Sequence, residues 1–229
     1  MENAGVPALH NGDRLTQAEF HRRYEAAPPD LKAELIGGIV YLASPADELH
    51  GVYHGDLGYL FGCYQRATPG MQAADNVTTI LGDESEPQPD LMLYILPEYG
   101  GQTRVAVIND IRYVQHAPEL VAEISHSRVA IDLHQKREDY RRHGVVEYLV
   151  WNVAERELHW FHFPSQGTIG PNREGVAKSK VLPGLWLDVQ AVVTEQYARQ
   201  TEVLQQGLAS KPHAAFVKRL AAAHKHRPQ

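Results

Sequence analysis

Apolar and polar residues alternate along residues 119–125, the pattern of a β-strand with two unlike faces. One face consists of Leu120, Ala122 and Ile124, and the other of Glu119, Val121, Glu123 and Ser125. A polar turn at His126-Ser127 follows the strand. Helical spacing then continues up to Gly144, which we expect to end the helix as its C-terminal cap. The pattern therefore predicts a strand-turn-helix unit in the middle of the chain.

Three charged residues of this region stand where the pattern expects burial. The positions Val129, Leu133, Lys136 and Tyr140 recur at spacings of four, three and four, which places them on one inward stripe of the helix. Lys136 thus occupies an apolar position, Glu123 lies in mid-strand, and Asp90 opens the apolar run 91–96. Because lone buried charges are strongly unfavourable, we expect them to be paired or to bind a metal. The residue types alone fit two interpretations equally: a structural Lys136–Glu123 ion pair, with Asp90 at a strand entry, or a functional site.

The same patterning predicts the remaining elements. We expect helices over 17–26 and 50–66, and a strand pair over 34–42 that turns at Gly37-Gly38. Further strands are predicted over 76–81, 91–96, 104–108 and 176–182, with a hairpin formed by 145–151 and 158–163. Residues 1–13 are expected to be disordered, 14–190 to form one domain, and 191–229 to form a helical basic tail.

The tail has two interpretations. Its apolar set of Val193, Tyr197 and Leu204 predicts a helix that ends at Lys211-Pro212, and Phe216, Leu220 and Ala223 suggest a second short helix. A solvated tail with one packing face is the simpler interpretation, and a nucleic-acid-binding arm is the alternative.

Composition narrows the class of protein. The chain has 229 residues, 43% of them hydrophobic and 22% charged, which is typical of a globular domain with an ample core. It contains no apolar run long enough to cross a bilayer and no signal sequence. Its single cysteine, Cys63, rules out an internal disulfide and a thiolate zinc site, so we expect a cytoplasmic protein. The net charge of −6 argues against a broad nucleic-acid-binding surface, although Arg137, Arg141, Arg142 and His143 form one local basic patch.

The order of several segments resembles a known family. These segments are AELIGGIVYLASP (33–45) followed by His50, PQPDLMLYI (87–95), PELVAEISHS (118–127), the helix with DLHQK (132–136), and GVVEYLVW (144–151). Together they resemble the Uma-two family of putative restriction endonucleases, of the PD-(D/E)XK nuclease superfamily, over about residues 15–193. One departure is His126, where the family usually has proline.

The resemblance implies an α/β, restriction-endonuclease-like fold with a central mixed, largely antiparallel sheet flanked by helices. It also implies that Asp90, Glu123 and the backbone carbonyl of Ile124 bind Mg²⁺ or Mn²⁺, and that Lys136 acts in catalysis with Glu34. Asp132 would hold Lys136 in place, and His50 would approach the site.

The resulting expectation is a metal-dependent endonuclease that cleaves DNA. A homodimer is compatible with it, because duplex cleavage requires two cuts. One alternative is a non-catalytic DNA-binding or assembly protein on the same fold. Another is a metal-dependent hydrolase of a different phosphodiester.

Overall fold

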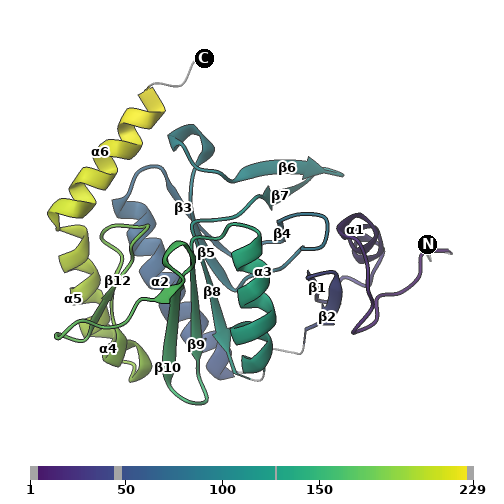
Figure 1. Cartoon of the computed structure of the whole chain (residues 1–229), viewed down its shortest axis with the longest axis horizontal. Coiled ribbons are helices and arrows are strands. Elements are labelled where there is room, and N and C mark those ends of the chain that lie inside the picture. The colour runs from purple at the N-terminus through teal and green to yellow at the C-terminus, as the bar shows by residue number, and fades with distance from the viewer. Residues whose placement is uncertain (1–4, 44–47, 127, 226–229) are drawn as a thin grey trace.

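A six-stranded mixed sheet forms the centre of the protein. The structure, a computed structural model, describes residues 5–43, 48–126 and 128–225. The strand order is β11-β10-β9-β8-β5-β3, in which β8 and β9 are parallel and all other neighbours antiparallel. The strands are β3 (Met71–Asp75), β5 (Leu91–Ile95), β8 (Leu120–Ser125), β9 (Glu147–Asn152), β10 (Glu157–His162) and β11 (Gly167–Thr168). The expected α/β fold with a largely antiparallel sheet is confirmed (Figure 1).

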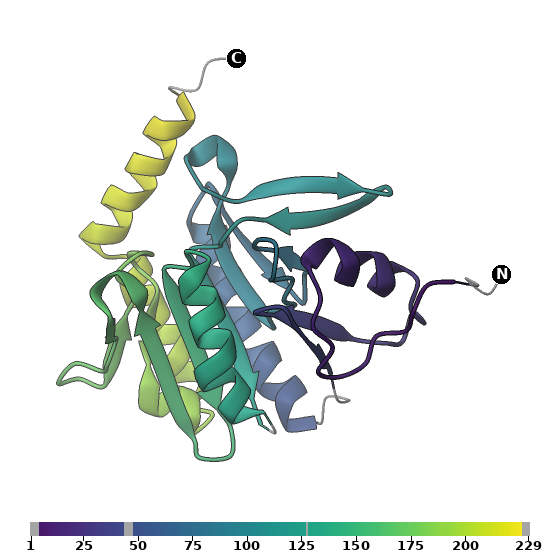
Figure 2. The same ribbon diagram turned by 45° about the vertical axis from the view of Figure 1, so that its right-hand side comes forward.

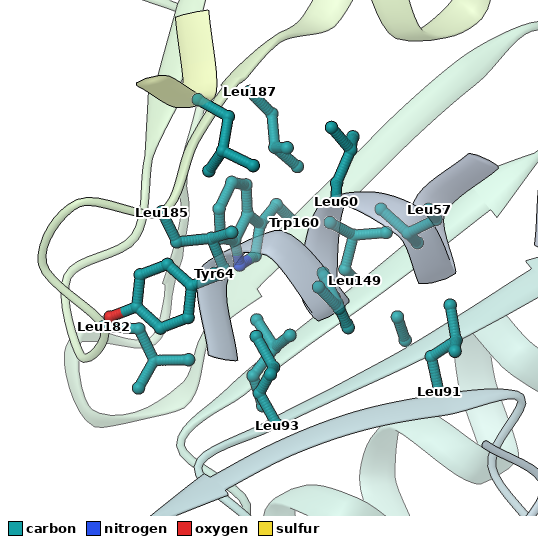
Figure 3. Close-up of a cluster of buried hydrophobic side chains, with 14 of the residues drawn as sticks. Leu57, Leu60, Tyr64, Leu91, Leu93, Leu149, Trp160, Leu182, Leu185 and Leu187 are labelled. Carbon is teal, nitrogen blue, oxygen red and sulfur yellow. The ribbon is translucent and has the colours of Figure 1, made fainter. Parts of the chain in front are cut away.

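Helices cover both faces of this sheet. The long helix α2 (Glu48–Ala67) lies behind it in Figure 1 and α3 (Arg137–Arg142) in front. The larger hydrophobic core is formed between α2, the sheet and the segment 182–187 that follows the sheet in the sequence. In Figure 3 this core is represented by Leu57, Leu60, Tyr64, Leu91, Leu93, Leu149, Trp160, Leu182, Leu185 and Leu187. Each fully buried leucine contributes about 1.5–3 kcal/mol, so this layer supplies much of the folding free energy.

The helix after β8 departs from regular α-helical geometry. Residues Ile131–Lys136 form a π-helical segment, η2, which continues into α3. The buried positions of this helix are Asp132, Lys136, Asp139 and Tyr140, whereas Val129 and Leu133, both expected on the inward stripe, are only partly buried. Two of the four expected inward positions, Lys136 and Tyr140, are thus buried.

Gly144 ends this helix as expected. Its φ of 91° is left-handed, its N–H donates to Arg141 O, and the N–H of Val145 donates to Tyr140 O. These two bonds form a Schellman motif, in which glycine accepts the positive φ without a steric penalty.

A separate N-terminal layer packs beside the sheet. It contains α1 (Gln17–Glu25) and the hairpin β1 (Ala33–Ile36)–β2 (Ile39–Leu42), whose turn residues Gly37 and Gly38 both have positive φ. This confirms the expected helix and strand pair.

Part of the N-terminus expected to be disordered is ordered. Within the described residues 5–13, Leu9 is buried beside Phe20, and the N–H of Gly12 donates to Val40 O at 2.8 Å. An apolar anchor and backbone pairing to β2 thus order a segment that lacks periodicity; residues 1–4 lie outside the described ranges.

Four strands were not predicted, and two predicted strands are shorter than expected. The unpredicted strands are β3, β7 (Ile111–Gln115), β11 and β13 (Trp186–Asp188). The predicted strand 76–81 contracts to β4 (Thr79–Ile80), and 176–182 contracts to β12 (Val176–Lys178), which pairs with β13. β4, β7 and β6 (Arg104–Ile108) form a small sheet, from which the β6–β7 hairpin extends over α1 (Figure 2). Short strands such as MQAAD carry little β-propensity and form because a neighbouring strand completes their hydrogen bonds.

The C-terminal segment is helical as expected, with different packing positions. It contains α4 (Val189–Val193), α5 (Tyr197–Leu208) and α6 (Lys211–Lys225). Leu204 is buried as expected, together with Val203, whereas Tyr197 is 47% exposed and Val193 is only partly buried. Phe216 and Leu220 anchor α6. Lys211-Pro212 begins α6, a position that proline tolerates in the first turn. Among the described residues, no helix combines the length and the apolar content needed to span a bilayer.

Glu119, which immediately precedes β8, is a buried carboxyl group with no ion-pair partner among the described residues. Glu119 is 6% exposed, and its Oε2 accepts the N–H of Ile95 at 2.7 Å. Burial outweighs this hydrogen bond and raises the pKa of Glu119 from 4.5 to about 7. Between these two pH values the folded state therefore binds more protons than the unfolded state, so stability falls as pH rises.

We expect Glu119→Gln to remove this dependence. The neutral amide should make the protein more stable than the wild type at pH 8, by up to about 3 kcal/mol, with no difference near pH 4.5. Urea denaturation at several pH values measures this, and Glu157→Gln, on the exposed side of β10, is the control. An unchanged pH slope in Glu119→Gln would show that Glu119 is ionised in the folded state.

Candidate active site

A cavity of about 400 Å³ opens where the N-terminal layer meets the ends of β5 and β8. All seven residues expected at the site line it: Glu34, His50, Asp90, Glu123, Ile124, Asp132 and Lys136. They come from β1, α2, β8, η2 and the residue before β5. The tertiary structure thus joins segments that lie about a hundred residues apart in the sequence.

Asp90 and Glu123 lie side by side because β5 and β8 are neighbours. In their antiparallel register Leu91 pairs with Ala122, which places Asp90 and Glu123 on the next rung of the ladder. Asp90 Oδ2 accepts the backbone N–H of Ile124 at 2.7 Å, a contact that holds the carboxyl group against β8. Both side chains line the cavity and therefore lie on the same side of the sheet.

Lys136 is the centre of the charge cluster. Its Nζ lies 2.9 Å from Glu34 Oε2, 3.0 Å from Glu123 Oε1 and 3.9 Å from Asp132 Oδ1, and the residue is only 7% exposed. Burial works to lower the pKa of Lys136, but the three carboxyl groups outweigh it and raise the pKa well above its ordinary value. The side chain is therefore a permanently charged ammonium.

The carboxyl groups are less evenly compensated. Burial raises the pKa of Glu123 well above its ordinary value, and the charges of Asp90, Asp132 and Glu34 add to this effect against the attraction of Lys136. Burial also raises the pKa of Asp132, whose Oδ2 accepts the hydroxyl of Ser125 at 2.6 Å. One ammonium thus shares the cavity with four carboxyl groups, and their crowding opposes the simultaneous ionisation of all four.

Asp90 differs from these groups. Its burial would raise the pKa, but the hydrogen bond and charge of His50, the Ile124 N–H and the charge of Lys136 together lower it. The Nε2 atom of His50 lies 3.2 Å from Asp90 Oδ2. Asp90 is therefore ionised over the physiological pH range and is suited to bind a cation.

Glu34 connects the N-terminal layer to the site. One of its oxygens binds Lys136, and the other accepts the backbone N–H of Gln88 at 2.8 Å. Two backbone hydrogen bonds between Leu35 of β1 and Glu86 hold the β1–β2 hairpin against the loop that precedes β5. This contact positions Glu34 at the site.

Sequence reasoning did not assign a site role to several residues that line the cavity or contact its carboxyl groups. The O–H of Tyr140 donates to Glu123 Oε1 at 2.9 Å, the oxygen that also binds Lys136. Ser125, His126 and Arg128 follow Glu123 along the cavity wall, and the Arg128 guanidinium donates to the carbonyl of Leu42. The i+4 spacing of Tyr140 from Lys136 was the available signal for Tyr140, whereas only tertiary structure brings Leu42 to Arg128.

The donor set fits a hard divalent cation. Carboxylate oxygens, a backbone carbonyl and water are the ligands that Mg²⁺ prefers, and a cation would relieve the repulsion between the crowded carboxyl groups. In the described ranges no three His, Cys, Asp or Glu side chains already converge as a closed ligand set. Glu34 and Asp132 are turned toward Lys136.

Comparisons with known proteins support this reading of the fold. Among solved structures, the chain is similar to that described as "Crystal structure of a putative nuclease belonging to DUF820 from Anabaena variabilis ATCC 29413", with a TM-score of 0.59 and 14% sequence identity. The similarity covers 79% of this chain and 98% of that one. No curated protein matches the chain.

The sequence profile of the Uma2 family, described as "Putative restriction endonuclease", matches residues 17–190. The matched region contains every residue of the candidate site and excludes α5 and α6. A match of this kind supports a nuclease-like function in general. Because it extends over most of the sequence, the chain belongs to the Uma2 family.

Proposed function

We propose that this protein is a Mg²⁺-dependent endonuclease that hydrolyses phosphodiester bonds in DNA. The observation that supports the proposal best is the buried ammonium of Lys136 beside Glu123 and Asp90 on adjacent strands. A structural ion pair requires one carboxylate, whereas three carboxyl groups lie within 4.0 Å of Lys136 Nζ, and these three and Asp90 all line one cavity.

Each residue has a defined role in this proposal. Asp90, Glu123 and the carbonyl of Ile124 would hold the ion, with Mn²⁺ as an alternative to Mg²⁺. When bound, the ion supplies a water of lowered pKa and polarises the phosphate. Lys136 offsets the negative charge that develops on the phosphate, and Glu34 and Asp132 keep its ammonium in position.

The rival function is DNA binding or assembly without catalysis. It would need neither the excess of carboxyl groups nor their access to solvent, both of which hinder binding to a polyanion. We infer a homodimer from the requirement for two cuts in duplex DNA. We infer a cytoplasmic location from the single cysteine, which fits a reducing compartment.

Cleavage of supercoiled, linear and branched DNA with Mg²⁺ or Mn²⁺ tests the proposal. We expect Glu123→Gln to lower the cleavage rate about 100-fold or more, because the amide keeps the shape of the side chain but not its charge. Glu119→Gln is the matched control, since Glu119 is also a buried glutamate, immediately precedes the strand that carries Glu123, and does not line the cavity. DNA binding without cleavage by the wild type under all these conditions would favour the rival function.

Lys136→Met should separate stability from activity. Without divalent ions, removal of the ammonium leaves the carboxyl groups uncompensated, and we expect a loss of about 3–5 kcal/mol in the free energy of unfolding. Saturating Mg²⁺ should restore much of this stability, while the single-turnover cleavage rate stays at least about 100-fold below the wild type. Lys218→Met, on exposed α6, is the control. Full activity of folded Lys136→Met would reduce Lys136 to a structural partner.

Tyr140→Phe tests how Glu123 is positioned. We expect Mg²⁺ affinity, measured by calorimetry, to change several-fold, because Glu123 Oε1 loses one of its two donors. Tyr148→Phe is a matched control, since Tyr148 packs against Tyr140 and its O–H donates to the backbone carbonyl of Asp132. Both variants should lose about 1 kcal/mol of stability. Equal Mg²⁺ affinities in the two variants would assign Tyr140 a purely structural role.

A further inference from the structure

A second cavity, of about 370 Å³, lies between α1 and the tip of the β6–β7 hairpin. Thr78 and side chains of α1 form one wall, and Asn109 and Ile111 of the hairpin form the other. It is distinct from the candidate active site, with which it shares no lining residue.

His21 presents an unpaired nitrogen in this region. The residue is 8% exposed, and its buried Nε2 atom has no hydrogen-bond partner among the described residues. Its Nδ1 atom lies 2.8 Å from Glu86 Oε1, and the other oxygen of Glu86 accepts the Gln17 amide at 2.6 Å. Because a carboxylate only accepts hydrogen bonds, a neutral His21 ring carries its proton on Nδ1 and has its lone pair on Nε2.

The nearest group to this lone pair is another carboxylate. Glu25 Oε1 lies 3.6 Å from His21 Nε2, one helical turn further along α1. Two ligands that each lie about 2.0–2.1 Å from a tetrahedral metal ion are about 3.4 Å apart, so this separation suits a bridging ion. The amide of Asn109 lies 2.9 and 3.1 Å from the two oxygens of Glu25.

We propose that His21 and Glu25 bind a divalent transition-metal ion of the Zn²⁺ class. If its side-chain amide flips by about 180°, Asn109 would supply its amide oxygen as a third ligand. Water would be the fourth ligand. The imidazole nitrogen selects Zn²⁺, Co²⁺ or Ni²⁺ over Mg²⁺. Glu86 is a positioning residue, since a carboxylate on the distal nitrogen fixes the ring and strengthens it as a ligand.

The ion would fasten α1 to the hairpin tip and thereby stabilise the layer that supplies Glu34. Gln88 links the two cavities: its side-chain amide donates to Thr78 Oγ1 at 2.9 Å and to Tyr24 O–H at 3.5 Å, and both residues line the second cavity. Its backbone N–H donates to Glu34 in the first cavity. The metal site does not depend on the nuclease activity.

Calorimetric titration of tag-free protein with Zn²⁺, in excess Mg²⁺, tests this site. We expect one Zn²⁺ per chain in the wild type and in Glu123→Gln. Affinity should fall about 100-fold in His21→Ala and at least about 10-fold in Glu25→Gln and Glu86→Gln. Zn²⁺ should raise the melting temperature of the wild type but not that of His21→Ala, and Co²⁺ should give the visible absorption of a four-coordinate ion.

His159→Ala is the matched control. The Nε2 atom of His159 also lies near a carboxylate, 3.2 Å from Glu157 Oε2, but this pair lies outside both cavities. We expect it to leave Zn²⁺ affinity unchanged. Glu25 is 30% exposed at its side chain, so Glu25→Gln should fold even if His21→Ala does not. Wild-type Zn²⁺ affinity in Glu25→Gln, or loss of the site in His159→Ala, would overturn the proposal.

Discussion

The ammonium of Lys136 is the interaction on which the site depends. It is buried, and its nearest partners come from a hairpin of the N-terminal layer, from the central sheet and from its own helix. An isolated charge in this position would destabilise the fold strongly, and four carboxyl groups without it would repel one another. Each element is therefore held to the others by charge as well as by apolar packing. The π-helical segment η2 ends at Lys136, and π segments often occur where a helix places a functional side chain.

The N-terminal layer needs this attachment because a two-stranded hairpin is marginally stable alone. Polar contacts with the loop over residues 82–90 help to join this layer to the body of the protein. Leu35 exchanges two backbone hydrogen bonds with Glu86, Glu34 accepts the N–H of Gln88, and Ser85 in the same loop donates to Asp139 of α3. The loop over residues 82–90 thus contacts β1, α3 and β5, and it fixes where Glu34 and Asp90 lie relative to Lys136.

Other buried carboxyl groups in the protein show what distinguishes the site. Glu147 accepts hydrogen bonds from Trp160, Ser179 and the backbone N–H groups of Lys180 and Val181, and so anchors the chain after β11 to the sheet. Glu119 is bound by the N–H of Ile95. Both are satisfied by neutral donors and lie away from the cavities. The candidate site instead combines crowded carboxyl groups, a buried cation and access to solvent, which is the combination expected for binding and chemistry rather than for support.

The sequence alone determined the strand with Glu123, the helix with Lys136, the Gly37-Gly38 hairpin and the cap at Gly144, because these depend on local periodicity and on backbone conformations that glycine permits. It also identified seven of the residues that line the cavity, through an apolar pattern interrupted by charges and through resemblance to a family. Tertiary structure decided that residues 131–136 form a π-helical segment, that Asp132 is buried and that Val129 is only partly so. It also decided the pairing of β3 and β13, the order of residues 5–13, and the contacts of Tyr140, Gln88 and His21. These features arise from partners distant in the sequence, whose hydrogen bonds and burial override weak local preferences.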